Sequence, residues 1–188
     1  MTEKGSLNSF SPAEPFGEGL VQVFTGDGKG KTTAALGTVL RAVGHGLRVY
    51  IVFFMKGGHP YGEGNILPKL PKVTMASFGQ KGFVDPVNIK AEEIGQAKQA
   101  LTAAREAMLS GNYDLIVLDE VNLAVAWKLV ELDEVLRLIS DKPLNVELIL
   151  TGRQAPTELI KRADLVTEML KIKHPYDKGI VARKGIDS

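Results

Sequence analysis

The chain has 188 residues, of which 44% are hydrophobic, and this length fits one well-cored domain. Its 23 basic and 22 acidic side chains leave a net charge of +1, which excludes the strong positive field used in non-specific nucleic-acid binding. The absence of cysteine excludes disulfides and thiolate metal sites, and no apolar run approaches the roughly 20 residues of a membrane span. We therefore expect a cytoplasmic protein that binds neither nucleic acid nor membrane.

The first half of the chain predicts an arm followed by the start of a parallel sheet. Residues 1–19 scatter Gly, Pro, Ser and Glu without an apolar segment, which is typical of a flexible arm, so the folded domain is expected over 20–188. Residues 20–24 form a short β-rich run, a glycine-rich loop follows, and residues 32–43 place apolar side chains at helical spacing. Residues 47–54 are apolar except for Arg48, which predicts a strand buried on both faces.

The second half continues this alternation. Residues 55–65 and 79–86 read as loops around a strand at 73–78, and the spacing of apolar residues predicts a helix over 91–109. A strand at 113–122 is expected to lead into one helix to about residue 140, and a strand at 145–153 into a helix near Pro156. Residues 165–170 predict a last strand, whereas the weak periodicity of 171–188 predicts no element. The alternation indicates an α/β fold in which helices cover both faces of a parallel sheet.

The stretch "TGDGKGKTTAALG", residues 25–37, carries a phosphate-binding pattern. In G-x-x-x-x-G-K-[ST], Gly30, Lys31 and Thr32 supply the second half, while Thr25 stands in place of the first glycine. Because the loop follows a strand and opens a helix, its backbone N–H groups point at an anion. Lys31 would neutralise phosphate charge, and the Thr32 hydroxyl would bind Mg²⁺. The alternative interpretation is a plain glycine turn between a strand and a helix.

Two carboxylates end the strand at 113–122. Asp119 and Glu120 suit a Mg²⁺·nucleotide site opposite the glycine loop. The alternative is a pair of solvated acids at the start of a helix. Together the two motifs predict a Mg²⁺·nucleoside triphosphate site, without deciding which atom of the nucleotide reacts.

The ordered set of motifs resembles a known family. "VFTGDGKGKTTAALGTVLRAVGHG", "FFMKG", "YDLIVLDEVNLA", "LILTGRQAP", "LIKRADLVTEM" and "KIKHPYDKGIVARKGI" look like successive motifs of the P-loop type of ATP:corrinoid adenosyltransferases, which act on cob(I)yrinic acid a,c-diamide or cob(I)alamin. The resemblance covers about residues 19–187. It implies a P-loop NTPase (RecA-like) fold, a three-layer sandwich around a mostly parallel sheet.

The resemblance also implies a reaction. The cobalt of the corrinoid, reduced to Co(I), attacks C5′ of ATP and expels triphosphate, with the nucleotide held in the loop in reverse orientation. It implies an electron donor such as a flavoprotein, and a homodimer in which the arm covers an active site, its own or the partner's. A P-loop ATPase or kinase that cleaves the β–γ bond, and an ATP-gated module that delivers a corrinoid, remain alternatives.

Several site residues follow from the resemblance. Thr32, Glu120 and Asp119 match the metal site, Arg41 and Arg153 match arginines near the nucleotide, and Lys31 and Phe83 match residues that serve catalysis. Phe83 falls where the family places an aromatic ring against the lower face of the corrin, although "GFVD" here replaces the "GFTW" of many relatives. For an arbitrary protein, Phe83 is more often a packing residue. The residues that match the ATP-binding loop are Gly26, Asp27, Gly28, Lys29, Gly30, Lys31, Thr32 and Thr33.

Overall fold

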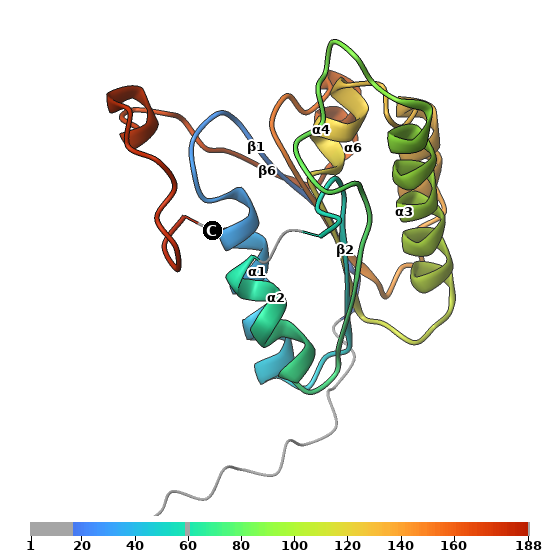
Figure 1. The fold of residues 1–188 in the computed structure, drawn as a ribbon. Helices are drawn as coiled ribbons and strands as arrows, with labels where there is room; N and C mark the ends of the chain where they lie inside the picture. The colour runs from blue at the N-terminus through green and yellow to red at the C-terminus, as the bar shows by residue number, and fades with distance from the viewer. Residues whose placement is uncertain (1–16, 59–60, 188) are drawn as a thin grey trace, which may run out of the picture.

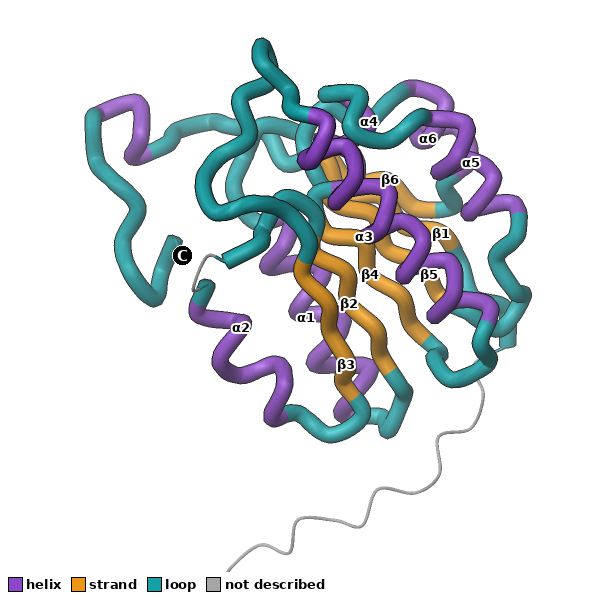
Figure 2. The backbone as a smooth tube through the Cα atoms, turned by 45° about the vertical axis from the view of Figure 1, so that its right-hand side comes forward, coloured by secondary structure: helices purple, strands orange, loops and turns teal. Residues whose placement is uncertain are grey.

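A six-stranded sheet forms the centre of the computed structural model, which describes residues 17–58 and 61–187 (Figures 1 and 2). The strands lie in the order β3-β2-β4-β5-β1-β6, and every pair of neighbours is parallel. The prediction of a mostly parallel sheet is therefore confirmed. The strand bounds are β1 Val21–Thr25, β2 Val49–Phe53, β3 Val73–Ser77, β4 Leu115–Asp119, β5 Glu147–Thr151 and β6 Leu165–Glu168.

The helices cover both faces of the sheet, as predicted. Figure 2 shows α1 and α3 on opposite sides. The helix bounds are α1 Lys31–Gly44, α2 Gly62–Ile66, α3 Ala91–Leu109, α4 Val121–Ala126, α5 Leu132–Ser140 and α6 Thr157–Arg162, with short 3-10 turns η1 Leu67–Lys69 and η2 Pro175–Lys178. None of the helices in the part of the chain that the structure describes is long and apolar enough to cross a membrane.

Alternate residues of each central strand supply the two cores. In β4, Ile116 and Leu118 belong to the core beneath α3 to α6, whereas Leu115 and Val117 belong to the core beneath α1. All five residues of this strand are buried, which explains its continuous apolar sequence. Trp127 is half-buried and packs against the larger core.

Two local predictions are wrong. The helix expected up to residue 140 is divided into α4 and α5, because Lys128 takes a left-handed conformation (φ 57°) and the turn brings Leu129 and Val130 into the core. The loop expected over 55–65 contains the start of α2, whose two glycines conceal the helix from the sequence pattern. Most of the expected arm, residues 1–16, lies outside the described residues.

Candidate functional site

The carboxyl ends of β1, β4 and β5 bring the predicted motifs to one edge of the sheet. The loop Gly26–Gly30 leaves β1 at this edge, and Lys31 is the first residue of α1. The Lys31 Nζ donates to the carbonyl oxygens of Gly26 and Gly28, at 2.7 and 2.8 Å. The ammonium is therefore folded into the loop and fixes its curvature. Thr32 and Thr33 follow in the first turn of α1, as predicted.

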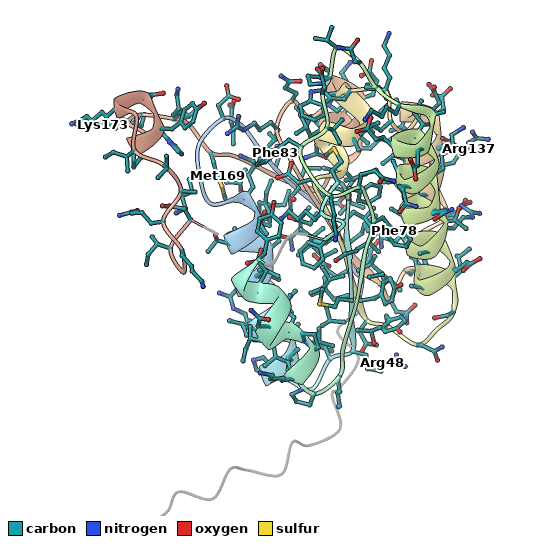
Figure 3. The ribbon with its side chains drawn as sticks, in the orientation of Figure 1. Arg48, Phe78, Phe83, Arg137, Met169 and Lys173 are labelled. Atoms are coloured by element: carbon teal, nitrogen blue, oxygen red, sulfur yellow. The ribbon has the colours of Figure 1, made fainter. Side chains whose placement is uncertain are left out.

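The glycine loop also contacts a segment that is far away in sequence, the chain just after β6. The Gly28 N–H donates to the Met169 carbonyl at 2.6 Å, and a Cβ on Gly26 or Gly28 would lie 2.5 or 2.6 Å from that same oxygen. Figure 3 shows Met169, just after β6, beside the loop. We expected these glycines to leave room for phosphate, and the structure adds a second reason, the close approach of the chain after β6.

Thr25 departs from the phosphate-loop pattern and has a structural task. Its side chain is buried, and its Oγ1 accepts a hydrogen bond from the Ala155 N–H at 3.1 Å. This contact joins the end of β1 to the chain that follows β5. A glycine at this position could not make it, so the replacement ties the two loops together.

Asp119 is enclosed by partners that the sequence pattern did not reveal. Its Oδ1 accepts from the Thr151 hydroxyl at 2.7 Å, and its Oδ2 accepts from the Lys56 Nζ at 2.6 Å. Burial opposes the charge of Lys56, but Asp119 outweighs it, and the pKa of Lys56 is raised. Each oxygen of Asp119 has a partner within the chain, and its role as a metal ligand stays a prediction.

Glu120 is better placed for a cation. It takes a left-handed conformation (φ 67°), stabilised by a 3.0 Å hydrogen bond from its N–H to the Thr151 hydroxyl. Burial, and next Asp119, raise the pKa of the Glu120 carboxyl, while Lys56 and Lys31 oppose the shift. A residue strained in this way at a strand end is typical of functional sites.

The electrostatics of Lys31 connect the loop with the carboxylates. Burial lowers the pKa of Lys31, and Glu120 is the strongest influence in the opposite direction. Arg153 lowers this pKa further, and Asp27 raises it. The structure thus brings these four predicted site residues into electrostatic reach of one another.

The oxygen atoms near the loop decide which metal ion could bind there. No group of three or more His, Cys, Asp or Glu that could hold a metal occurs among the described residues. Thr32 and Glu120 offer hard oxygens, which fit Mg²⁺, an ion commonly held by one or two protein ligands together with substrate phosphates.

Two other predicted residues belong to other parts of the fold. Phe83 is 92% exposed, in the segment between β3 and α3 (Figure 3), which leaves the sheet at the same carboxyl edge. Arg41 lies ten residues after Lys31 on α1, roughly 15 Å along the helix axis. There it lines a cavity of about 430 Å³ with Gln22 and Glu147, at the amino ends of the strands. Its role near the nucleotide stays a prediction.

The tail, for which no element was predicted, returns to the loop (Figure 1). The Lys29 Nζ donates to the Ile186 carbonyl at 2.8 Å and forms an ion pair with Asp187. Arg183 donates to the other oxygen of Asp187 at 2.8 Å. Hydrogen bonds from Arg183 and Lys29 hold the pKa of Asp187 well below its usual range. The predicted ATP-binding residue Lys29 is therefore engaged with the end of the chain.

Comparisons with known proteins agree on one family. The model of the family "ATP:corrinoid adenosyltransferase BtuR/CobO/CobP" matches residues 17–188. The corrinoid adenosyltransferase of Escherichia coli K12 is 36% identical over 169 residues, which are 90% of this chain and 85% of that protein. Corrinoid adenosyltransferase CobA of Salmonella typhimurium gives the same identity and coverage.

A solved structure supports the fold. The RadB recombinase superposes with a TM-score of 0.53 at 15% identity, covering 85% of this chain and 78% of its own. At this identity the similarity shows the fold alone. It confirms the RecA-like P-loop architecture.

Proposed function

Because the chain belongs to the family of ATP:corrinoid adenosyltransferases, we propose that it transfers the 5′-deoxyadenosyl group of ATP to the Co(I) centre of a corrinoid. The observation that carries the proposal is the match of residues 17–188 to this family, in a structure that places the glycine loop and Glu120 at one edge. The product is an adenosylcorrinoid of cobalamin biosynthesis or salvage. A kinetic comparison across corrinoids measures which of them the protein prefers.

The chemistry needs little from the protein beyond binding and charge. A Co–C bond forms with the electron pair of Co(I), the C5′–O bond breaks, and triphosphate leaves with that bond's electrons. Since the corrinoid brings the nucleophile, no serine, cysteine or histidine base is required. The chain must instead stabilise a highly charged leaving group, which suits Lys31, the loop N–H groups and the helix N-terminus.

Further components belong to the same proposal. Mg²⁺ held by Thr32 and Glu120 would neutralise phosphate charge as the triphosphate departs. The nucleotide would lie in the loop with its γ-phosphate at the place other P-loop proteins give the α-phosphate, so that C5′ faces the corrinoid. An electron donor such as a flavoprotein would reduce the cobalt to Co(I). The protein would act as a cytoplasmic homodimer.

The decisive experiment follows both products. The protein is incubated with MgATP and chemically reduced cobalamin or cobinamide, and we expect a light-sensitive adenosylcorrinoid and triphosphate in equal amounts. Release of ADP and phosphate would identify an ATPase or kinase. Tight binding of ATP and corrinoid without turnover would identify a delivery module.

Phe83 is proposed to contact the lower face of the corrin and to favour cobalt reduction. Phe83→Ala should then slow the reaction far more when it starts from Co(II) with a reductant than when Co(I) is supplied. Equal slowing in both assays would exclude a role in reduction. Asp85 stands where many relatives have tryptophan. We therefore expect Asp85→Trp to increase the rate of adenosylation when the reaction starts from Co(II) with a reductant.

A further inference from the structure

Lys56 is a largely buried lysine at the carboxyl edge of the sheet. It lies three residues after the end of β2, and its Nζ lies 2.6 Å from Asp119 Oδ2, with side-chain exposures of 12% and 1%. The same Nζ lies 5.2 Å from the centroid of the Phe53 ring and 4.7 Å from that of Tyr61. A carboxylate and two aromatic faces therefore surround the ammonium, which suits a fixed internal cation better than one that reaches for substrate.

The backbone around Lys56 holds the neighbouring loop. The Lys56 N–H donates to the Phe78 carbonyl at 2.9 Å, and the Phe78 N–H donates to the Phe53 carbonyl at 2.9 Å. One residue further, a Cβ on Gly57 would lie 1.7 Å from the Gly79 carbonyl oxygen. The chains after β2 and β3 thus touch backbone to backbone, with no room for a side chain between them.

This contact ends four residues before Phe83. Gly79 itself has φ 128°, and a Cβ on it would lie 2.9 Å from the Met55 Cα. The chain leaves this fixed point through Gly82 (φ 112°) toward the exposed ring of Phe83. The loop that carries Phe83 therefore begins at a point fixed against the chain after β2.

We propose that Lys56 is a positioning residue that couples Asp119 to the loop carrying Phe83, and so places this loop for the corrinoid. The path runs from the carboxylate at the end of β4, through the ammonium, to the backbone contact of Gly57 with Gly79. The inference rests on the proposed function for the identity of the ligand at Phe83. The contacts that carry it belong to the fold alone.

The test separates corrinoid from nucleotide. In Lys56→Met we expect the KM for cobinamide to rise by about tenfold, with a change in the KM for ATP of less than about twofold. Lys98→Met, which removes an exposed lysine of α3, is the matched control and should leave both constants unchanged. A rise in the KM for ATP alone would show that Lys56 serves the triphosphate, and unchanged constants would show that it positions nothing; either result overturns the proposal.

A second readout does not depend on activity. Hydrogen–deuterium exchange of Lys56→Met should accelerate by about tenfold or more at residues 79–86, while residues 26–33 keep the rate of the wild type. Uniform acceleration along the chain would indicate general destabilisation and refute the coupling. If the wild type makes no adenosylcorrinoid, the proposed function fails, whereas the exchange pattern still decides the coupling.

A second variant perturbs the other end of the proposed path and leaves the buried charges of Lys56 and Asp119 in place. Gly57→Ala introduces the forbidden Cβ against Gly79 and should reproduce the same selective loss toward cobinamide. Wild-type constants and exchange in Gly57→Ala would contradict the proposed path.

Discussion

Adding one methyl group to the nucleotide loop should have the opposite effect to adding one to the helix that follows it. In Gly28→Ala the new Cβ would lie 2.6 Å from the Met169 carbonyl oxygen and 2.7 Å from that of Leu170. In Gly37→Ala, within α1, the Cβ meets no atom within 4 Å. The two variants differ in the space available, since neither glycine has a positive φ.

The expected magnitude at Gly28 follows from these contacts. Ordinary contact begins at 3.4 Å, so the loop and the chain after β6 must separate by several tenths of an ångström. This strains the 2.6 Å hydrogen bond from the Gly28 N–H to Met169, worth about 1 kcal/mol, and overpacking adds about 1–3 kcal/mol. We expect Gly28→Ala to lower the free energy of unfolding by about 2–4 kcal/mol. Gly37→Ala should raise it by about 0.5–1 kcal/mol, because alanine reduces the entropy of the unfolded chain.

Urea unfolding followed by circular dichroism measures both changes. At a slope of about 2 kcal/mol per molar urea, the midpoint should fall by about 1–2 M for Gly28→Ala and rise slightly for Gly37→Ala. ATP binding, measured by calorimetry, should weaken only in Gly28→Ala. A Gly28→Ala protein within about 0.5 kcal/mol of the wild type would refute the view that the chain after β6 fixes the loop.

Three further perturbations address the site and the surface. Thr151→Val removes the hydroxyl that holds Glu120 and should weaken Mg²⁺·ATP binding in calorimetry, whereas Thr151→Ser should not; equal affinities would contradict this. Lys31→Ala should lower the rate of triphosphate release by about 100-fold or more, and wild-type turnover would exclude the proposed loop chemistry. A hydrogen bond from Arg48 lowers the pKa of Asp114, so its stabilisation is complete above the unfolded pKa of about 4 and is lost as the pH falls through the lower folded pKa. Asp114→Asn should flatten the acid limb of a plot of unfolding free energy against pH, and an unchanged slope would argue against this pair.

The layers and the glycine loop could be predicted because their signals are local. A continuous apolar run such as that of β4, followed by apolar residues at helical spacing, predicts a strand buried on both faces. This prediction does not require knowing which strands lie beside it in the sheet. The predicted limits of β1 and the predicted start of α1 therefore each agree with the structure within one residue.

The partners of Asp119 could not be predicted because they depend on strand order. Lys56, Asp119 and Thr151 follow or end β2, β4 and β5, which are neighbours in the sheet although they are far apart in sequence. Nothing in "FFMKG" or "LILTGR" says which strands are adjacent. The spacing of Arg41 from the glycine loop is likewise uninformative, because a motif close to the loop in sequence continues along a helix that runs away from it.

The contact between the glycine loop and Met169 also bears on how the protein is made. The loop leaves the ribosome before the residue against which it closes, which is synthesised about 140 residues later. At about 5–20 residues per second, this interval lasts roughly 10 seconds. A nascent chain therefore contains the glycine-loop sequence for several seconds before Met169 is available to close the loop. ATP can bind the completed fold, but it cannot assist folding during the synthesis of the first half of the domain.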